Sequence, residues 1–230
     1  MNPRVAESGM ALVVALLLTL LMSTLAVALV MTTTTDTLVA GAFASRAGAL
    51  AAADAGLARV MRDLSTMATW DAVIDGSTRS SFTDGPPSGI RSLADGRTID
   101  LTQIRNQANC GKATTCTASD LSAVTDTRPW AANNPVWQLY AYGRMADVAG
   151  TGRIDSPYYL VVFVGDDPGE TDGNPWRDAA EPGAPGGGVV ALRAEAFGPV
   201  SVHRVVEATV ARPVAAGVPG LEVRSWREVR

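Results

Sequence analysis

The sequence contains little of the chemistry that most enzymes and nucleic-acid-binding proteins use. Its 230 residues include one histidine, His203, and one lysine, Lys112. A single histidine without a nucleophile elbow supports no Ser/His/Asp arrangement, and no Gly-rich phosphate loop ending in lysine is present. The net charge of -4 argues against a nucleic-acid partner, because binding to phosphates needs a basic face. We therefore expect a protein that is not an enzyme, with no small-molecule substrate and no organic cofactor.

Charge is also absent from one long apolar segment. The run from Met10 to Met31 has no charged residue, and its only polar side chains are Thr19, Ser23 and Thr24. About 20 apolar residues cross the hydrocarbon core of a bilayer as a helix. The run is longer than the apolar region of a signal peptide, which has about 7–15 residues. We predict a retained transmembrane helix over 10–35, and an uncleaved signal anchor stays open as an alternative.

The charges on either side of this segment predict its orientation. Arg4 and the α-amino group precede it, partly offset by Glu7, and the next cation is Arg46. Positive charge close to one end of a span favours the cytoplasm for that end. We therefore expect a single-pass protein of the inner membrane with its C-terminal domain in the periplasm.

The helix is predicted to continue well past the apolar segment. Residues 10–64 contain no proline and are rich in strong helix formers. Apolar side chains recur on one side of residues 36–64, which predicts an amphipathic half that packs on a partner; they are Val39, Phe43, Leu50, Leu57, Val60, Met61 and Leu64. A helix of about 50 residues is about 75 Å long, so the apolar half is expected to protrude from the globular part.

The remaining sequence predicts a small antiparallel sheet. Residues 65–135 are rich in turn signals and read as a connecting region. Residues 136–230 form the predicted β-domain, and Gly198-Pro199 joins the last two of its strands. The strands are expected in four runs with period-two alternation or continuous apolar character: 136–145, 158–164, 188–197 and 200–210. Together with the helix they define an α+β fold. Arg224, Arg227 and Arg230 are expected in a solvated end.

The chain has two cysteines, Cys110 and Cys116, within the connecting region. Outside the inner membrane, a short-range disulfide is the natural pairing. A metal site would need further thiols or histidines near them, and the alternative is two free thiols. A disulfide here would close one small loop and add modest stability.

An acidic loop follows the strongest predicted strand. Its oxygen-bearing side chains lie close in sequence among Gly and Pro residues, which suits a calcium ion; they are Asp166, Asp167, Glu170, Asp172, Asn174 and Asp178. The spacing differs from that of an EF-hand. A solvated acidic loop is the alternative interpretation.

The N-terminal segment resembles a known family. Residues 7–12, ESGMAL, precede a leucine-rich run, and residues 53–57, ADAGL, are close to a motif of the type IV pilins and the related pseudopilins of type II secretion. The resemblance is greatest to the minor pilins of the PilX type, over about residues 4–64. A weaker resemblance covers the predicted final hairpin, residues 191–198 and 205–210.

The resemblance implies processing and assembly. A prepilin peptidase would remove the leader 1–9 by cleavage between Gly9 and Met10, and Met10 would then be methylated at its new N-terminus. The apolar helix would pack with other pilin subunits, and the protein would move from the inner membrane to the pilus at the cell surface. Alternatives are a type II secretion pseudopilin and an uncleaved, membrane-anchored periplasmic binding module.

One position departs from the family pattern. Pilins similar to this chain carry a glutamate at the fifth residue of the mature chain, and that residue here is Val14. Family members without this glutamate resemble initiating or tip subunits, which have no subunit ahead of them to pair with. The resemblance therefore implies a priming or tip position.

Overall fold

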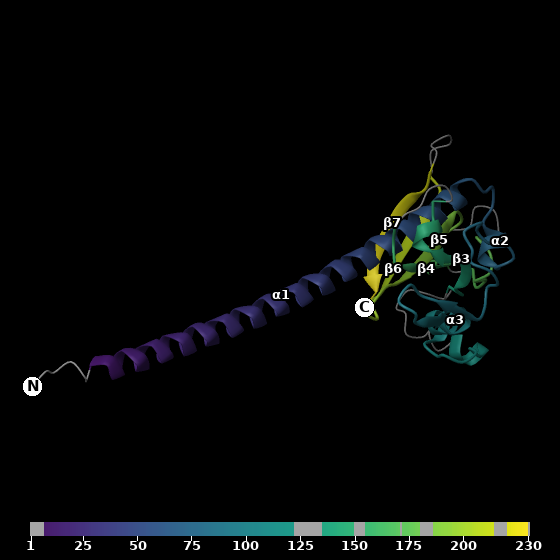
Figure 1. The fold of residues 1–230 in the computed structure, drawn as a ribbon. Coiled ribbons are helices and arrows are strands. Elements are labelled where there is room, and N and C mark those ends of the chain that lie inside the picture. The colour runs from purple at the N-terminus through teal and green to yellow at the C-terminus, as the bar shows by residue number, and fades with distance from the viewer. Residues whose placement is uncertain are drawn as a thin grey trace, which may run out of the picture. The chain divides into compact units, whose positions relative to one another are not determined.

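The computed structural model describes residues 7–121, 135–149, 155–170, 172–179, 186–213 and 220–229. The chain divides into two compact units, Met1–Ala44 and Ser45–Arg230, and helix α1 contributes to both. The elements follow in chain order, and Figure 1 labels the three α-helices and strands β3 to β7. They are α1 (Glu7–Ser65), α2 (Asp71–Ile74), β1 (Ile90–Ser92), β2 (Thr98–Asp100), α3 (Leu101–Cys110), β3 (Gln138–Arg144), a 3-10 turn (Met145–Asp147), β4 (Tyr159–Asp166), β5 (Val189–Phe197), β6 (His203–Ala211) and β7 (Glu222–Val229). The predicted α+β class is confirmed.

The second unit contains a five-stranded antiparallel sheet with the order β3-β4-β5-β6-β7. Every residue of β4 is buried, because its continuous apolar run faces covering elements on both sides. The four predicted strands are all present, with ends displaced by a few residues. Strand β7 adds a fifth: Arg227 pairs with Glu207 of β6, so this C-terminal segment is part of the sheet and not a free end.

The C-terminal part of α1 packs on one face of the sheet. The buried helix residues are mostly small, and they contact Leu160 and Val162 of β4 and Ala194 of β5. A Cβ added at Gly56 would lie 3.1 Å from Val162 Cγ2, so glycine permits this close approach. The helix residues in this core are Ala49, Ala52, Ala53, Leu57, Val60 and Leu64.

Burial along the predicted stripe of α1 begins later than the sequence indicates. Phe43 is 68% exposed and Val39 is also exposed, whereas Ala49 is fully buried. In the second unit the cover over α1 starts at Tyr158, whose hydroxyl donates to the Ser45 carbonyl at 3.0 Å. Val39 and Phe43 are therefore exposed in the first unit, and the buried part of the stripe lies in the second unit.

The opposite face of the sheet is covered by α3, labelled in Figure 1, and by the two-stranded sheet β1-β2. Leu101 and Ile104 of α3 join a core with Trp137 and Phe163. The Asp100 carboxylate caps α3 by accepting from the backbone N–H groups of Thr102 and Gln103. The connecting region thus contains regular elements whose apolar residues complete a second core.

The end of α1 is fixed to the sheet through Trp70. The indole is fully buried, and its Nε1 donates to the Leu64 carbonyl at 3.1 Å. The Arg212 guanidinium lies 4.2 Å from the ring centroid, and Arg212 Nη1 donates to the Met67 carbonyl at 3.1 Å. A cation over a buried indole and two hydrogen bonds to backbone carbonyls connect this corner.

Candidate assembly helix and processing site

The first unit presents an exposed apolar surface. Every side chain from residue 9 to residue 44 is exposed, including leucines, valines and methionines throughout the segment. Among the described residues, α1 is the one helix with the length and composition to cross a membrane. An exposed apolar surface of this size in water is unfavourable, so it needs lipid or other apolar helices around it.

The hydroxyl groups of this segment bond to the helix itself. Thr19 donates to the Leu16 carbonyl at 2.9 Å, and Ser23 donates to the Thr19 carbonyl at 2.8 Å. The same back-bonding occurs at Thr24, Thr32, Thr33, Thr34, Thr35 and Thr37. Because these donors need no outside partner, hydroxyls up to Thr35 are compatible with an apolar environment.

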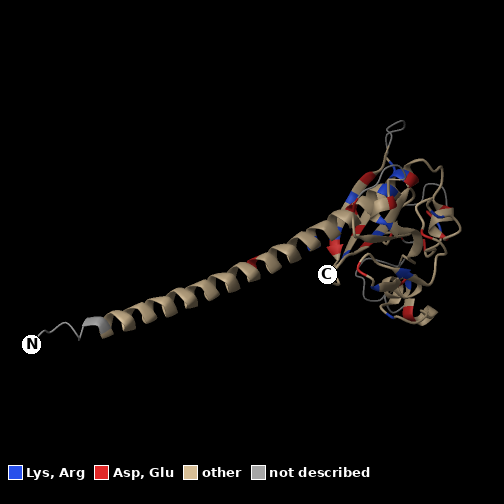
Figure 2. Cartoon of the chain, viewed as in Figure 1, with Lys and Arg blue, Asp and Glu red and all other residues tan. Residues whose placement is uncertain are grey.

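Charged residues are sparse along the first unit's part of α1 (Figure 2). Between Gly9 and Ala53 the sequence has two charged residues, Asp36 and Arg46, and neither makes an ion pair or side-chain hydrogen bond with the described residues. The next charge, Asp54, accepts a hydrogen bond from Trp226 Nε1 at 2.9 Å. The apolar surface thus carries one unpaired carboxylate and is followed by one unpaired cation.

The predicted cleavage position lies in the first turn of α1. The helix begins at Glu7, so Gly9 and Met10 are already helical, and residues 1–6 of the leader lie outside the described residues. The first four N–H groups of a helix have no intrahelical acceptor. Opening this turn to a protease therefore sacrifices few hydrogen bonds. A Cβ at Gly9 would meet nothing within 4 Å, so packing within the chain does not require glycine there.

The two cysteines lie at the end of α3. Cys110 is the last residue of the helix, and it forms a disulfide with Cys116, with 6.0 Å between the two Cα atoms. Gly111 follows in the left-handed conformation, with φ of 71°, and ends the helix. The bond closes the short loop that leaves α3.

The acidic loop uses several of its carboxylates to cap backbone N–H groups. Asp167 accepts from Gly169 at 3.0 Å, Asp172 from Asn174 at 2.7 Å, and Asp178 from Gly188 at 2.6 Å. Glu170 is buried, and the Ala179 backbone N–H lies close enough to its carboxylate to favour the charged form. No group of three or more Asp, Glu, His or Cys side chains within the described ranges is placed to hold a metal ion. The side chains of Asp167, Asp172 and Asp178 thus turn the loop, whereas Asp166 and Glu170 are buried.

Calcium binding by this loop stays a prediction. Binding would draw Glu170 and its acidic neighbours together around one cation, because Ca²⁺ takes six to eight oxygen ligands. Calorimetric titration of calcium into the full chain should give saturable heat and raise the melting temperature. Absence of both effects would contradict the prediction, and magnesium titrated in parallel controls for simple charge screening.

Two buried carboxyl groups in this loop predict a pH dependence of stability. Burial and the nearby Glu170 charge raise the pKa of Asp166 to about 8, and burial and the Asp172 charge raise the pKa of Glu170 to about 7. The folded protein therefore favours the neutral acids, and this contribution to stability is lost as the pH rises through both values. We expect the melting temperature to be several degrees higher at pH 5.5 than at pH 8.5. An Asp166→Asn/Glu170→Gln variant should lose most of that difference, and an unchanged difference would contradict the assignment.

A network of charges crosses strands β5, β6 and β7. Arg193 bonds Glu195 and Glu207, at 2.8 Å in each case, and Glu207 also pairs with Arg227. His203 Nε2 lies 2.9 Å from the second oxygen of Glu195. Burial alone would raise the pKa of Glu195, but the His203 hydrogen bond and the Arg193 charge outweigh it and hold that pKa below its usual range. The histidine thus contributes to a cross-strand network that sequence inspection did not reveal.

A strained turn joins β5 and β6. Val200 and Ser201 have φ of 55° and 61°, a conformation that usually takes Gly or Asn. Val200 is 86% exposed. A β-branched apolar residue held exposed in this conformation is an outlier that points to a function for the tip.

One apolar helix followed by an antiparallel sheet is the architecture of a pilin-like subunit. Residues 8–58 match the family model described as PilX N-terminal, a span that includes Gly9, Met10, Val14 and the ADAGL stretch at residues 53–57. This segment is therefore similar to the N-terminal segment of the PilX-type minor pilins of type IV pili, and the match covers about a fifth of the chain. No curated protein and no solved structure matches the chain.

Proposed function

We propose that this chain is a non-enzymatic structural subunit that takes part in type IV pilus assembly from the inner membrane. The observation that carries the proposal is the exposed helix surface over residues 9–44, which has one charge and self-satisfied hydroxyls. Such a surface is stable in a bilayer, and equally stable in a bundle of apolar helices that replaces the bilayer. The same segment matches the PilX N-terminal family.

Processing between Gly9 and Met10 is supported by the open space around Gly9. There is open space where a side chain at residue 9 would lie, so the fold would accept a larger residue. A requirement for glycine must then come from a partner that approaches the backbone. A prepilin peptidase that acts within the membrane is such a partner, and it would leave Met10 as the N-terminus for methylation.

A priming or tip position is supported by Val14. Its side chain is exposed and apolar, so it offers no carboxylate to the N-terminal amine of a subunit ahead. A subunit at the tip has no such neighbour. A periplasmic location of the second unit is supported by the Cys110–Cys116 disulfide, because disulfides persist in oxidising compartments.

The proposal is tested by deleting the gene in its native organism and counting surface pili. We expect a large loss of pili, restored by the wild-type chain supplied in trans, with the protein present in sheared pili at far less than the level of the major subunit. Unchanged piliation with loss of a type II secreted protein would instead identify a pseudopilin. Unchanged piliation and secretion would leave the uncleaved anchor as the better interpretation.

A further inference from the structure

We propose that two copies of this chain associate head to tail through an ion pair between Asp36 of one copy and Arg46 of the other. The contact seats the Asp36 carboxylate in a basic pocket of the second unit, beside the exposed tip of the β5-β6 hairpin. The inference rests on the proposed function, because it assumes that the apolar surface of α1 is used for assembly.

The first observation is the isolation of Asp36. It is the one charged residue in the segment 9–44, and the exposed apolar side chains of Leu38, Val39 and Phe43 follow it. When the surrounding surface is buried among other helices, an unpaired carboxylate there is strongly unfavourable. A cation supplied by the neighbour would remove this penalty. The partner of this surface is therefore expected to be basic at one point and apolar around it.

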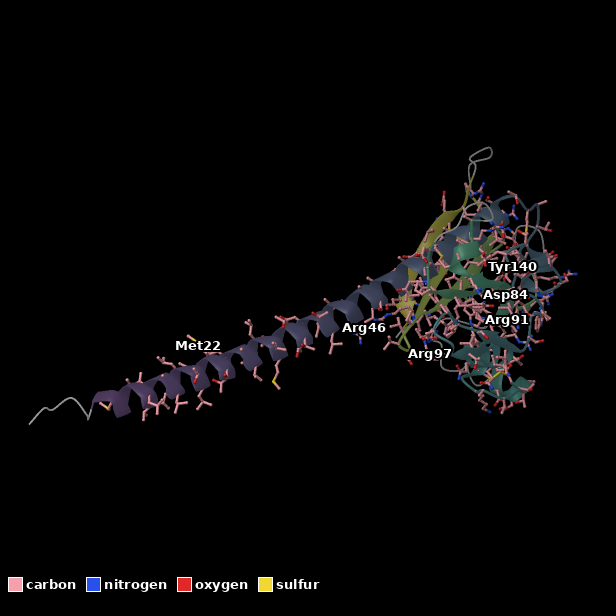
Figure 3. The ribbon with its side chains drawn as sticks, in the orientation of Figure 1. Met22, Arg46, Asp84, Arg91, Arg97 and Tyr140 are labelled. Carbon is pink, nitrogen blue, oxygen red and sulfur yellow. A yellow bond between two sulfur atoms is a disulfide. The ribbon has the colours of Figure 1, made fainter. Side chains whose placement is uncertain are left out.

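The second observation is a pocket with that character at the start of the second unit. It is lined by Arg46, Val200, Ser201, Val202, His203 and Arg204. Arg204 is paired with Glu228 at 3.0 Å and His203 with Glu195 at 2.9 Å. Arg46, labelled in Figure 3, makes no ion pair or side-chain hydrogen bond with the described residues. The pocket thus has one available guanidinium among groups that are already neutralised.

The rim of the pocket complements the surroundings of Asp36. Val200 is 86% exposed at the tip of the β5-β6 hairpin, where Arg97 also holds the turn by donating to Ser201 Oγ at 3.1 Å (Figure 3 labels Arg97). Gly or Asn at residue 200 would relieve the backbone strain, but the chain has an exposed valine there. A neighbouring helix with Leu38 and Phe43 beside its carboxylate would cover that group.

The spacing of the two charges sets the geometry. Ten residues of α-helix correspond to an axial distance of about 15 Å. An Asp36 and an Arg46 on one helix therefore cannot meet, whereas two parallel copies displaced by about 15 Å along their axes bring them together. The two copies use different surfaces, so the contact is heterologous. The copy that contributes Asp36 keeps a free Arg46, and the copy that contributes Arg46 keeps a free Asp36.

A second copy is favoured as the occupant because this chain itself carries both halves of the contact. Val14 offers no carboxylate to the N-terminal amine of a subunit ahead. Between Gly9 and Ala53, Asp36 is the one carboxylate that could replace it. The proposed contact would let a second copy follow the copy at the tip although residue 14 is a valine.

The test uses the full-length chain with two different affinity tags, co-expressed and extracted in a mild detergent. Purification through one tag should recover the second tagged copy. Asp36→Arg and Arg46→Asp should each lower this recovery at least tenfold, since truncated or reversed charge pairs at interfaces have effects of this order or larger. The charge-swapped double variant should return recovery to within about threefold of wild type.

A matched control is Arg105→Asp, which reverses an exposed arginine on α3 and should leave recovery unchanged. Melting of the second unit, followed by tryptophan fluorescence, should be the same for all variants. The proposal is overturned if the wild-type copies do not copurify, if single reversals have no effect, or if the swapped pair stays as weak as the single variants. Both charges lie beyond the leader, so this outcome is independent of whether residues 1–9 are removed.

Discussion

Replacing Gly9 with valine is expected to abolish removal of the leader, so that the chain accumulates in the membrane at its full length. The fold itself should tolerate the change, because a Cβ at residue 9 meets nothing within 4 Å. A β-branched residue next to the scissile bond would instead hinder access to the backbone and stiffen the first turn of α1. The measurement is the intact mass of the chain purified from cells that contain the prepilin peptidase.

The matched control is Gly41→Val. It makes the same substitution in the same helix, also with nothing within 4 Å of the new Cβ. Both variants add an apolar group to an exposed apolar surface, so they should insert in the membrane equally well. We expect Gly41→Val to be processed like wild type. If Gly9→Val were processed at the wild-type rate, the assignment of this position would be wrong.

Replacing Trp70 with alanine is expected to produce the largest loss of stability of any single substitution outside the assembly surface. The change would leave a large cavity between the end of α1 and the sheet, and buried Trp→Ala substitutions cost about 3–5 kcal/mol. It would also remove the ring beneath Arg212 and the hydrogen bond to the Leu64 carbonyl. The free energy of unfolding of the full chain in detergent, from a urea titration, measures the effect.

Trp176 provides the control for this prediction. It is 43% exposed in the acidic loop, so its replacement by alanine should change the unfolding free energy by less than about 1 kcal/mol. Equal losses for the two variants would show that Trp70 does not fix α1 to the sheet as described. Changes in salt concentration should not restore the unfolding free energy of either variant, because the loss comes mainly from packing.

The elements that depend on local pattern could be predicted from the sequence. The long helix follows from the absence of proline over residues 10–64, and β4 follows from its continuous apolar run. Strand β7 could not be predicted from local pattern, because its side chains are mostly exposed. Its extended conformation is fixed by backbone pairing with β6. The length of helix α3 is not evident from the sequence, because its apolar face is short and is completed by Trp137, just before β3, and by Phe163 of β4.

The same division holds for the candidate sites. Gly9, Met10 and Val14 are read from their positions relative to the apolar run, and the family match covers all three. The pocket around Arg46 could not be predicted, since its other lining residues come from the β5-β6 hairpin about 150 residues away in the sequence. Likewise, Asp166 and Glu170 looked like equivalent acidic residues, and only folding separates buried groups from those that cap the loop.

The most direct test of the account is the mass of the wild-type N-terminus in cells with and without the prepilin peptidase. The account predicts a chain that begins at Met10 with a methylated amine when the peptidase is present, and an intact leader when it is absent. A chain that keeps residues 1–9 in both strains would contradict the central claim that α1 is the processed assembly helix of a minor pilin.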